Sequence, residues 1–270
     1  FRSSFSRLVS SCLTIGSGGS AGPEAPVVMS GSAIGSSVAR LLGLAERQRI
    51  VLVGCGAAGA IASIFNAPIA GIVFSMEVIL GAWTRVAIGP IAIAAVTGTE
   101  VSRLLQGNQI PFRHSPFTVD LVDILAAPGL AVAAALASLL MTWMIRGSHR
   151  LWERAARPVW LRALAGGTVV GLLGMAAPVV LGEGYAAVRA MITGSFEAGL
   201  VLVVAAVVAK CLATAMTIGS GGSGGIFAPS LLVGALTGLG YHHALSALWP
   251  GGGWVDEGCF ALLGMAGLVS

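Results

Sequence analysis

The stretch Thr14-Ile15-Gly16-Ser17-Gly18-Gly19-Ser20 occurs twice in this chain, and its second copy begins at Thr217. The two copies are offset by 217 − 14 = 203 residues. The register then continues without a gap, with twelve identities in the twenty-two positions of 14–35 and 217–238. Self-similarity at a fixed offset predicts two copies of one structural unit.

The composition indicates where these copies reside. Only 10% of the 270 residues are charged (15 basic, 11 acidic), against about 25% in soluble proteins. Hydrophobic residues make up 56%, and the mean hydropathy is +0.91. These values exclude a soluble globular enzyme, a disordered chain and a basic nucleic-acid binder. The 39 glycines have no period of three, which excludes collagen. The class that remains is a polytopic α-helical membrane protein.

Long runs without Asp, Glu, Lys or Arg support this class. They cover residues 25–39, 51–76, 86–99, 124–145, 163–182 and 211–255. A spanning helix needs about 20 mostly apolar residues, so some runs are full spans and others half-spans or tilted helices. The last run has room for more than one segment, and we expect breaks at 219–225 and 250–253. Continuous apolar runs argue against a transmembrane β-barrel.

A basic segment divides the chain. Residues 146–162 contain five arginines and one glutamate, a net charge of 5 − 1 = +4. The positive-inside rule places such a connector on the cytoplasmic side. We therefore expect first-repeat helices over 1–145, a cytoplasmic connector over 146–162 and second-repeat helices over 163–270. Binding of anionic lipid or substrate by the arginines is the alternative interpretation.

The repeated loop favours anion binding. A Gly-Ser-Gly-Gly-Ser run cannot continue a regular helix, and irregular backbone inside a membrane is tolerated only where it lines a cavity or is buried in protein. Each copy ends in Ala-Pro before an apolar stretch that predicts a helix, from Val27 onward and from Pro229 onward. Two helix N-termini facing each other could hold a desolvated anion with N–H groups and helix dipoles. Close packing of small residues would explain Gly166, Gly167, Gly171 and Gly174, but not two matched loops.

One position differs in kind between the copies. Glu24 in the first corresponds to Phe227 in the second. An acid beside an anion site competes with the anion when ionised and vacates the site when protonated. Acids inside membranes are expensive and mark functional sites, so we interpret Glu24 as a protonatable gate. A helix-capping carboxylate without a transport role is the alternative.

Three segments together resemble the CLC family of chloride channels and chloride/proton antiporters. Gly22-Pro23-Glu24-Ala25-Pro26 is similar to the family's Gly-Lys/Arg-Glu-Gly-Pro motif with its external gating glutamate. Gly225-Ile226-Phe227-Ala228-Pro229 is similar to its Gly-x-Phe-x-Pro motif, which supplies amides to the central anion. Residues 66–77 (Asn-Ala-Pro-Ile-Ala-Gly-Ile-Val-Phe-Ser-Met-Glu) resemble the family's Asn-Ala-Pro-Leu-Ala-Gly segment and the helix that follows. The likeness runs from residue 12 to the C-terminus.

The resemblance implies an all-α membrane protein with an inverted-topology repeat of tilted, broken helices. It also implies homodimers with one pore per subunit, in the plasma (inner) membrane of a bacterium. The family's first signature, Gly-Ser-Gly-Ile-Pro, does not precede residue 14, and the helix with its inner tyrosine would follow Ser270. We therefore expect the chain to be the central part of the transmembrane domain.

The expected function is CLC-type transport of a small anion, chloride first, as a proton-coupled antiporter gated by Glu24. The anion-binding residues implied are Ser17, Ser20, Gly22, Pro23, Ala25, Gly225, Ile226, Phe227 and Ala228. Pro26 argues against the fluoride-transporting branch, which usually has valine there, and the choice between chloride and nitrate stays open.

The main alternative is a passive voltage- or pH-gated chloride channel. Antiporters commonly carry two adjacent glutamates after the Asn-Ala-Pro segment, whereas Glu77 is followed here by Val78. A membrane enzyme or scaffold is a remote alternative, because no nucleophile–base pair or cluster of His, Cys, Asp and Glu falls at a predicted interface.

The expected partners are the anion, protons, membrane lipid and a second copy of the chain, without nucleic acid. No cofactor signature is present. Tyr241, His242 and His243 lie together, but no cysteine or second carboxylate is near them in sequence. An interfacial belt therefore fits these residues better than a metal site.

Overall fold

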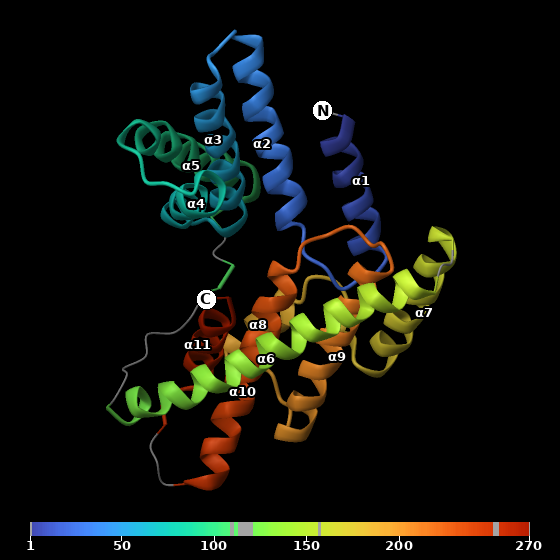
Figure 1. The fold of residues 1–270 in the computed structure, drawn as a ribbon. Helices are drawn as coiled ribbons and strands as arrows, with labels where there is room; N and C mark the ends of the chain where they lie inside the picture. The colour runs from blue at the N-terminus through green and yellow to red at the C-terminus, as the bar shows by residue number, and fades with distance from the viewer. Residues whose placement is uncertain (1, 109–110, 113–120, 156–157, 251–253, 270) are drawn as a thin grey trace. The chain divides into compact units, whose positions relative to one another are not determined.

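A computed structural model describes residues 2–108, 111–112, 121–155, 158–250 and 254–269. Within these residues the chain forms α-helices joined by loops, and the two short helices η1 and η2 are π-helical and 3-10 (Figure 1). The chain divides into two compact units. Unit 1 comprises residues 1–12 and 23–111, and unit 2 comprises residues 13–22 and 112–270. The helices are α1 (Arg2–Gly16), α2 (Glu24–Leu41), α3 (Glu46–Phe65), α4 (Pro68–Phe74), η1 (Ser75–Leu80), α5 (Arg85–Gln106), α6 (Leu121–Arg154), α7 (Val159–Ala176), η2 (Pro178–Val180), α8 (Tyr185–Ile192), α9 (Leu200–Gly219), α10 (Phe227–Leu248) and α11 (Glu257–Val269).

Six of the described helices are long and apolar enough to cross a bilayer. They are α3, α5, α6 from Asp123, α7, α9 and α10. The all-α membrane class predicted from composition is therefore confirmed. The run 211–255 is broken as predicted between α9 and α10, and the second expected break falls partly on residues outside those described.

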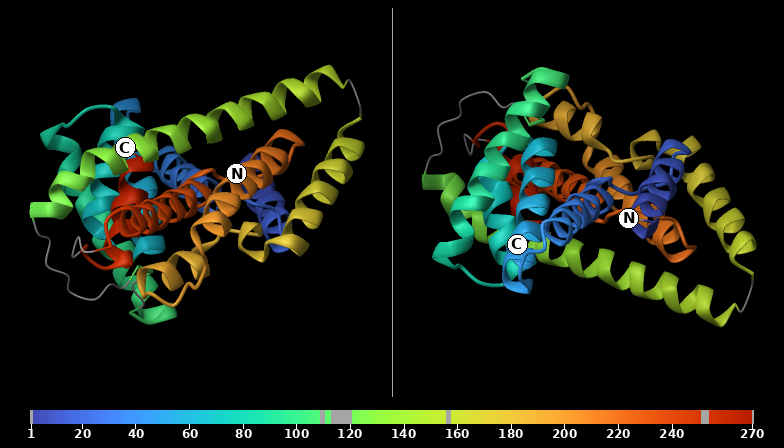
Figure 2. Two further views of the ribbon diagram at one scale, coloured as in Figure 1. Left: turned by 90° about the horizontal axis from the view of Figure 1, so that it is seen from below. Right: turned by 90° about the horizontal axis from the view of Figure 1, so that it is seen from above.

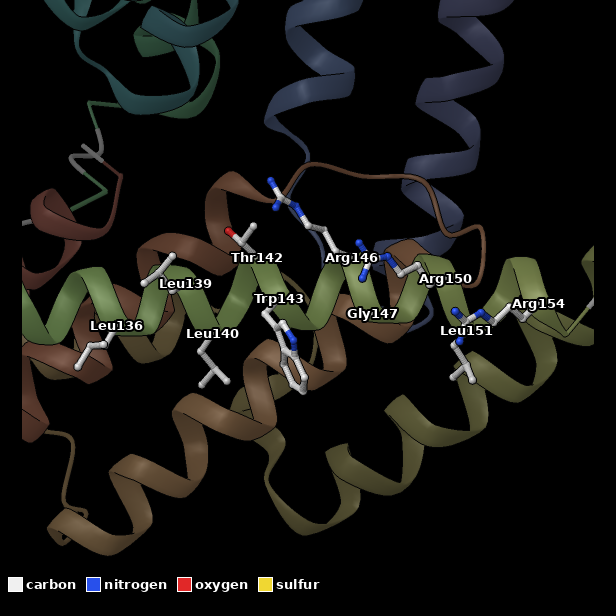
Figure 3. A pocket seen from close by; sticks show the side chains of 10 residues that line it. All are labelled: Leu136, Leu139, Leu140, Thr142, Trp143, Arg146, Gly147, Arg150, Leu151 and Arg154. Carbon is white, nitrogen blue, oxygen red and sulfur yellow. The ribbon is translucent and has the colours of Figure 1, made fainter.

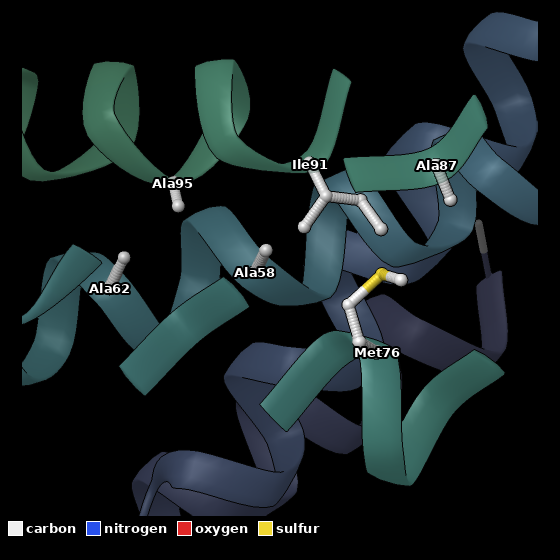
Figure 4. Close-up of a cluster of buried hydrophobic side chains, with 6 residues drawn as sticks. All are labelled: Ala58, Ala62, Met76, Ala87, Ile91 and Ala95. Atoms are coloured by element: carbon white, nitrogen blue, oxygen red, sulfur yellow. The ribbon is translucent and has the colours of Figure 1, made fainter. Parts of the chain in front are cut away.

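Unit 1 is built around α3, which packs against α2, α4, α5 and η1. Small residues bring these helices close together. A Cβ atom on Gly31 would overlap the carbonyl of Gly56, so α2 and α3 touch through backbone. On the other face of α3, Met76 and Ile91 fill the space that four alanines leave, as Figure 4 shows. All six side chains of this cluster are fully buried: Ala58, Ala62, Met76, Ala87, Ile91 and Ala95.

A break that the sequence analysis did not predict divides the run 51–76. Asn66 has φ +53, the left-handed conformation that ends α3, and Pro68 begins α4. The Asn66 side chain accepts a hydrogen bond from Arg103 Nε (2.6 Å) and donates one to Asn108 Oδ1 (2.8 Å). Asparagine tolerates this backbone conformation better than most residues, because its short polar side chain bonds locally. The Asn-Ala-Pro segment is thus a corner fastened to the end of α5.

Unit 2 is built around α10, which packs against α6, α8, α9 and α11. Glycines again set the spacing, since a Cβ on Gly234 would lie 2.6 Å from the carbonyl oxygen of Gly264 in α11. The α7 helix packs against α9 and η2. Figure 2 shows α6 passing α9 and α10, with α7 returning from its end. The centre of unit 2 is therefore the helix that follows the second copy of the repeated loop.

The longest helix of unit 2 contains the first part of the predicted basic connector, residues 146–154, and its last part, 159–162, lies in α7. The 34 residues of α6 extend about 51 Å at 1.5 Å per residue, beyond the roughly 30 Å hydrocarbon core. A shallow hollow of about 870 Å³ runs along this helix and is lined by its own residues. In Figure 3, Arg146 and Arg150 point to one side of α6, and Leu140 and Trp143 point to the other side. The cytoplasmic placement of 146–162 stays a prediction, and Arg157 lies outside the described residues.

Candidate functional site

The two copies of the repeated loop have the same backbone conformation. Gly18 has φ +95 and its repeat mate Gly221 has φ +105, values that only glycine adopts readily. Each loop also closes on its own threonine. The N–H of Gly19 donates to Thr14 O (2.8 Å), and the N–H of Gly222 donates to Thr217 O (2.9 Å). The letter-for-letter repeat is therefore also a repeat of turn geometry.

The loops are bonded to each other by their threonine hydroxyls. The N–H of Ser20 donates to Thr217 Oγ1 (3.0 Å), and the N–H of Ser223 donates to Thr14 Oγ1 (3.1 Å). Each copy thus supplies the acceptor for the other's serine amide. The sequence analysis did not single out these threonines. The repeat itself held the signal, since both lie at its first position.

Gly22 and Gly225 complete the junction. The N–H of Gly22 donates to Gly225 O (2.8 Å), and the N–H of Gly225 donates to Gly22 O (2.7 Å). We expected both glycines to offer their amides to an anion. In the structure each amide is bonded to the other glycine instead. Pro23, the residue between Gly22 and α2, has no N–H group to offer. These three residues position the helix starts and do not supply free donors.

The two candidate serines also bond within the junction. Ser17 Oγ donates to Thr14 O (3.0 Å), and Ser20 Oγ shares a hydrogen bond with Thr214 Oγ1 (2.9 Å). Ser20 and Thr214 are fully buried. The Ser17 hydroxyl proton is therefore directed at a carbonyl oxygen and not at a bound anion.

A cavity of about 270 Å³ lies beside the junction. It has room for several water molecules, each of which takes about 30 Å³ in liquid water. Its lining is mixed, with hydroxyls and bare backbone on the loop side and the small residues of α7 opposite. The lining residues are Thr14, Ser17, Gly18, Gly19, Ala163, Gly167, Val170, Gly171, Leu181, Thr217, Ser220, Gly221 and Gly222.

The glycines of α7 divide into two kinds at this cavity. A Cβ on Gly166 would overlap Ser220 Oγ, and one on Gly174 would overlap Leu181. Close packing, the explanation offered from sequence, is confirmed for these two. Gly167 and Gly171 have nothing within 4 Å of such a Cβ, and both line the cavity. Because Gly167 and Gly171 have no side chains, the cavity is wider on the side of α7.

Lys210, on α9, holds the turn between Val180 and Gly182 in place by hydrogen bonds. Its side chain is fully buried, and Nζ donates to Val180 O (3.0 Å) and Gly182 O (2.8 Å). The N–H of Gly182 in turn donates to Gly18 O in the first loop (3.3 Å). Hydrogen bonds from this buried side chain to two backbone carbonyls are the contacts of an internal anchor. Beside it, burial raises the pKa of Glu183 above its ordinary 4.5, and the charges of Arg189 and Lys210 oppose that rise.

The helices that follow the two loops begin alike. Pro23 before α2 has φ −80 and ψ −10, and its repeat mate Ile226 before α10 has φ −91 and ψ −5. Pro26 and Pro229 are the third residues of their helices, so the predicted first-turn placement is confirmed. Both helices start slightly earlier than expected, at Glu24 and Phe227. The first N–H groups of a helix have no acceptor within it, and Ala25 and Ala228 lie at such positions.

Glu24 is the first residue of α2 and is only 3% exposed. Burial disfavours an ionised carboxyl, whereas the positive end of the helix dipole favours it, so the two effects oppose each other at this position.

The segment after the Asn-Ala-Pro corner ends in the π-helical turn η1. Ser75 Oγ donates to Gly54 O (2.7 Å), which holds η1 against α3. Met76 is buried, and Glu77 and Val78 are exposed on unit 1. That Val78 occupies the position of the second glutamate of antiporters stays a prediction, which holds if Glu77 corresponds to the first.

Comparison with known proteins gives consistent results. The family described as "Voltage gated chloride channel" matches residues 1–270. A ClcB-like chloride channel protein of Ralstonia nicotianae is 36% identical, over 100% of this chain and 63% of its own length. The voltage-gated ClC-type chloride channel ClcB of Salmonella dublin is 30% identical, over 97% of this chain and 62% of its own.

Two solved structures share the fold. A slow cyanobacterial Cl⁻/H⁺ antiporter matches with a TM-score of 0.83 at 22% identity, over 97% of this chain and 62% of its own. A CLC-type fluoride/proton antiporter matches with a TM-score of 0.74 at 26% identity, over 92% of this chain and 60% of its own. These matches confirm the predicted fold class. The chain thus spans about three fifths of the length of each of these four proteins.

Proposed function

The chain belongs to the voltage-gated chloride channel (CLC) family and is a multi-pass membrane protein with bacterial relatives, and from this we propose a function. We propose that the complete protein, of which this chain is a part, transports chloride in exchange for protons. The observation that carries the proposal is Glu24, a buried acid that opens α2 directly after the reciprocally bonded junction. In this proposal Glu24 is the gate, which blocks the anion path when ionised and leaves it when protonated.

Each motif would offer an anion backbone N–H groups and the positive end of the helix that it begins, α2 or α10. The family resemblance implies the amides of Ala25, Phe227 and Ala228 for this role, with Ile226 as the N-cap of α10. Gly22, Pro23 and Gly225 would act by fixing where the helices begin, since each helix starts two residues after one of the bonded glycines. Ser17 and Ser20 would stabilise the loops through their hydrogen bonds with Thr14 and Thr214. Such a site needs no formal positive charge, in keeping with the low charge of the chain.

A passive chloride channel is the second candidate, and one observation favours it. Val78 stands where antiporters of the family commonly have the inner proton-transfer glutamate, and its side chain is 65% exposed on unit 1. Without that acid, protons from the inner side would lack a relay toward Glu24. We retain antiport as the first candidate because Glu24, the outer acid, is present and buried.

Flux measurements separate these candidates. The complete protein is reconstituted into liposomes with a chloride gradient, and chloride and pH are recorded together by electrodes. The antiporter proposal predicts proton movement driven by the chloride gradient at a fixed stoichiometry. Chloride flux without proton movement would establish the channel. Absence of chloride, nitrate and fluoride flux would exclude both.

Variants test the gate itself. Glu24→Gln and Glu24→Ala are expected to abolish proton coupling and the pH dependence of flux while chloride still moves. Glu46→Gln is the matched control, because Glu46 also opens a helix of unit 1 but its side chain is 65% exposed. If the pH dependence survives in both Glu24 variants, the gate is another residue. Chemical cross-linking in the same liposomes would test the proposed homodimer.

A further inference from the structure

A cluster of possible metal ligands lies at the end of α10 away from the loops. His242 and His243 lie in the last two turns of α10, and Glu257 is the first residue of α11. Glu257 Oε1 is 3.4 Å from His243 Nε2 and 4.0 Å from His242 Nδ1. One ligand atom from each residue lies within 4.8 Å of the other two. The structure therefore supplies the carboxylate that the His-His pair lacks in sequence.

Close packing of α10 on α11 fixes this cluster. Gly238 lies one turn before His242, and a Cβ there would overlap the carbonyl oxygen of Phe260. The Phe260 ring also packs on His242, with ring centroids 5.4 Å apart. Two helices in backbone contact one turn away cannot separate without repacking the core of unit 2. The His pair and Glu257 are thus held on a rigid frame, which a metal site requires.

The surroundings of the cluster favour a cation. His242 Nδ1 is buried and has no hydrogen-bond partner among the described residues. Asp123 and Asp256 lie near enough for their charges to act on His242, in addition to Glu257. Asp123 Oδ1 accepts a hydrogen bond from the N–H of Val255 (3.0 Å), which holds that carboxylate beside the start of α11. The C-terminal end of a helix also carries partial negative charge.

We propose that His242, His243 and Glu257 bind a divalent transition-metal ion of the zinc class. Two imidazole nitrogens and one carboxylate oxygen form a ligand set that Zn²⁺ prefers, with a fourth position left for water. Mg²⁺ and Ca²⁺ take oxygen ligands and are disfavoured by the two histidines. The site lies fifteen residues along α10 from Phe227, about 22 Å at 1.5 Å per residue, so it is separate from the proposed anion site.

To close the site, ligand atoms that lie within 4.8 Å of one another must approach to the spacing around a bound ion. In tetrahedral coordination with Zn–N bonds of about 2.0 Å, ligand atoms lie roughly 3.3 Å apart, less than the 4.8 Å limit here. Consecutive side chains of a helix point about 100° apart, so His242 and His243 can bind one ion only if it lies at a point between the two rings. Glu257, which is near both, stands at that point. The bound ion would tie the end of α10 to the start of α11.

Metal binding is tested on the complete protein in detergent, with any polyhistidine tag removed. Titration with Zn²⁺ is followed by calorimetry, and Co²⁺ is added separately for its tetrahedral absorption spectrum. The variants are His242→Ala, His243→Ala and Glu257→Gln. His149→Ala is the matched control, because His149 is an exposed histidine on α6 of the same unit. Thermal unfolding with and without Zn²⁺ is measured for every variant.

The proposal predicts one Zn²⁺ per chain and a Co²⁺ spectrum of tetrahedral type. Affinity should fall at least tenfold in each of the three variants and stay unchanged in His149→Ala. Zn²⁺ should raise the unfolding temperature of the wild type and of His149→Ala only. Equal affinity in all four variants, or equal binding of Mg²⁺, would overturn the proposal. The His243 and Glu257 side chains are 22% and 35% exposed, so their variants are expected to fold even if His242→Ala does not.

Discussion

Gly22 and Gly225 donate a backbone hydrogen bond to each other, at 2.8 and 2.7 Å. Their numbers differ by 225 − 22 = 203, the offset of the sequence repeat, so each glycine is bonded to its own repeat mate. The same exchange relates Thr14 and Ser223 to Thr217 and Ser20. Bonds that map onto themselves when the copies are exchanged define a local two-fold axis. The repeat is therefore a symmetry of contacts as well as of letters.

The threonine hydroxyls are expected to hold this junction together. Thr217→Val removes the acceptor of the Ser20 N–H and should lower the free energy of unfolding by about 1–3 kcal/mol, the cost of a buried unsatisfied donor. Thr14→Val should cost less, because Ser223 is partly exposed whereas Ser20 is fully buried. Denaturant unfolding of the complete protein in detergent measures both. Thr168→Val on exposed α7, whose hydroxyl bonds only within its helix, is the control. Equal losses in all three variants would contradict a specific role for the junction.

Glycine is expected to be obligatory at some positions around the cavity and replaceable at others. A Cβ on Gly222 would lie 2.5 Å from Thr217 O, so Gly222→Ala should destabilise by about 1–3 kcal/mol through overpacking. Gly167 lines the same cavity in the interior of α7 with nothing within 4 Å, so Gly167→Ala should be neutral or stabilise by up to about 1 kcal/mol. Thermal unfolding of the two variants side by side gives the comparison. A stable Gly222→Ala would show that the loop can shift, against the geometry described.

Lys210 is the only lysine in the chain and is fully buried. In the folded protein we expect an amine-reactive ester to label it far more slowly than in denaturant, because reaction requires local opening of α9 and η2. Mass spectrometry of the peptide that contains Lys210 measures the rate in both conditions. A small free amine added to both samples provides the reference rate. Equal labelling before and after denaturation would mean that the two carbonyl contacts do not persist in solution.

Glu183 is expected to make stability depend on pH. Burial raises its pKa above 4.5, so the folded state favours the protonated form. That contribution is complete below pH 4.5 and is lost as pH rises through the folded-state pKa. Glu183→Gln removes the titration. The wild type should therefore lose stability relative to Glu183→Gln as pH increases from about 4.5, as measured by unfolding temperatures at matched pH. A difference that stays constant, or that changes in the opposite direction, would contradict this assignment.

Local sequence signals predicted the features that depend on residues close together in the chain. Charge-free runs marked most of the spans but not the first half of α9, because Lys210 lies inside that helix. The Ala-Pro pairs gave the starts of α2 and α10 to within three residues, because proline fits the first turn of a helix. The repeat gave the matched loops. Asn66 was missed as a helix end, although an asparagine followed two residues later by proline is a stop signal for a helix. Its contacts with Arg103 and Asn108 are visible only in the structure.

Partner choice between distant segments was beyond sequence reasoning. Gly22 and Gly225 were expected to offer amides to an anion, and only the folded structure reveals that each amide bonds the other glycine. Likewise Glu257 reaches the His pair through the packing of α10 on α11, which no spacing rule encodes. The roles of Glu24 and of the amides of Ala25, Phe227 and Ala228 stay predictions for flux measurements to decide.

The reciprocal bonds at the junction also bear on how such a chain could arise. Among the described residues, each of the four backbone N–H bonds between the loops has a counterpart in which the two copies exchange the roles of donor and acceptor, so the loop is complementary to itself. A half-length ancestor with a single loop could have made all of these bonds with a second molecule of itself. Gene duplication and fusion would then have converted an existing interface between subunits into an internal one, with no new contact required at the seam.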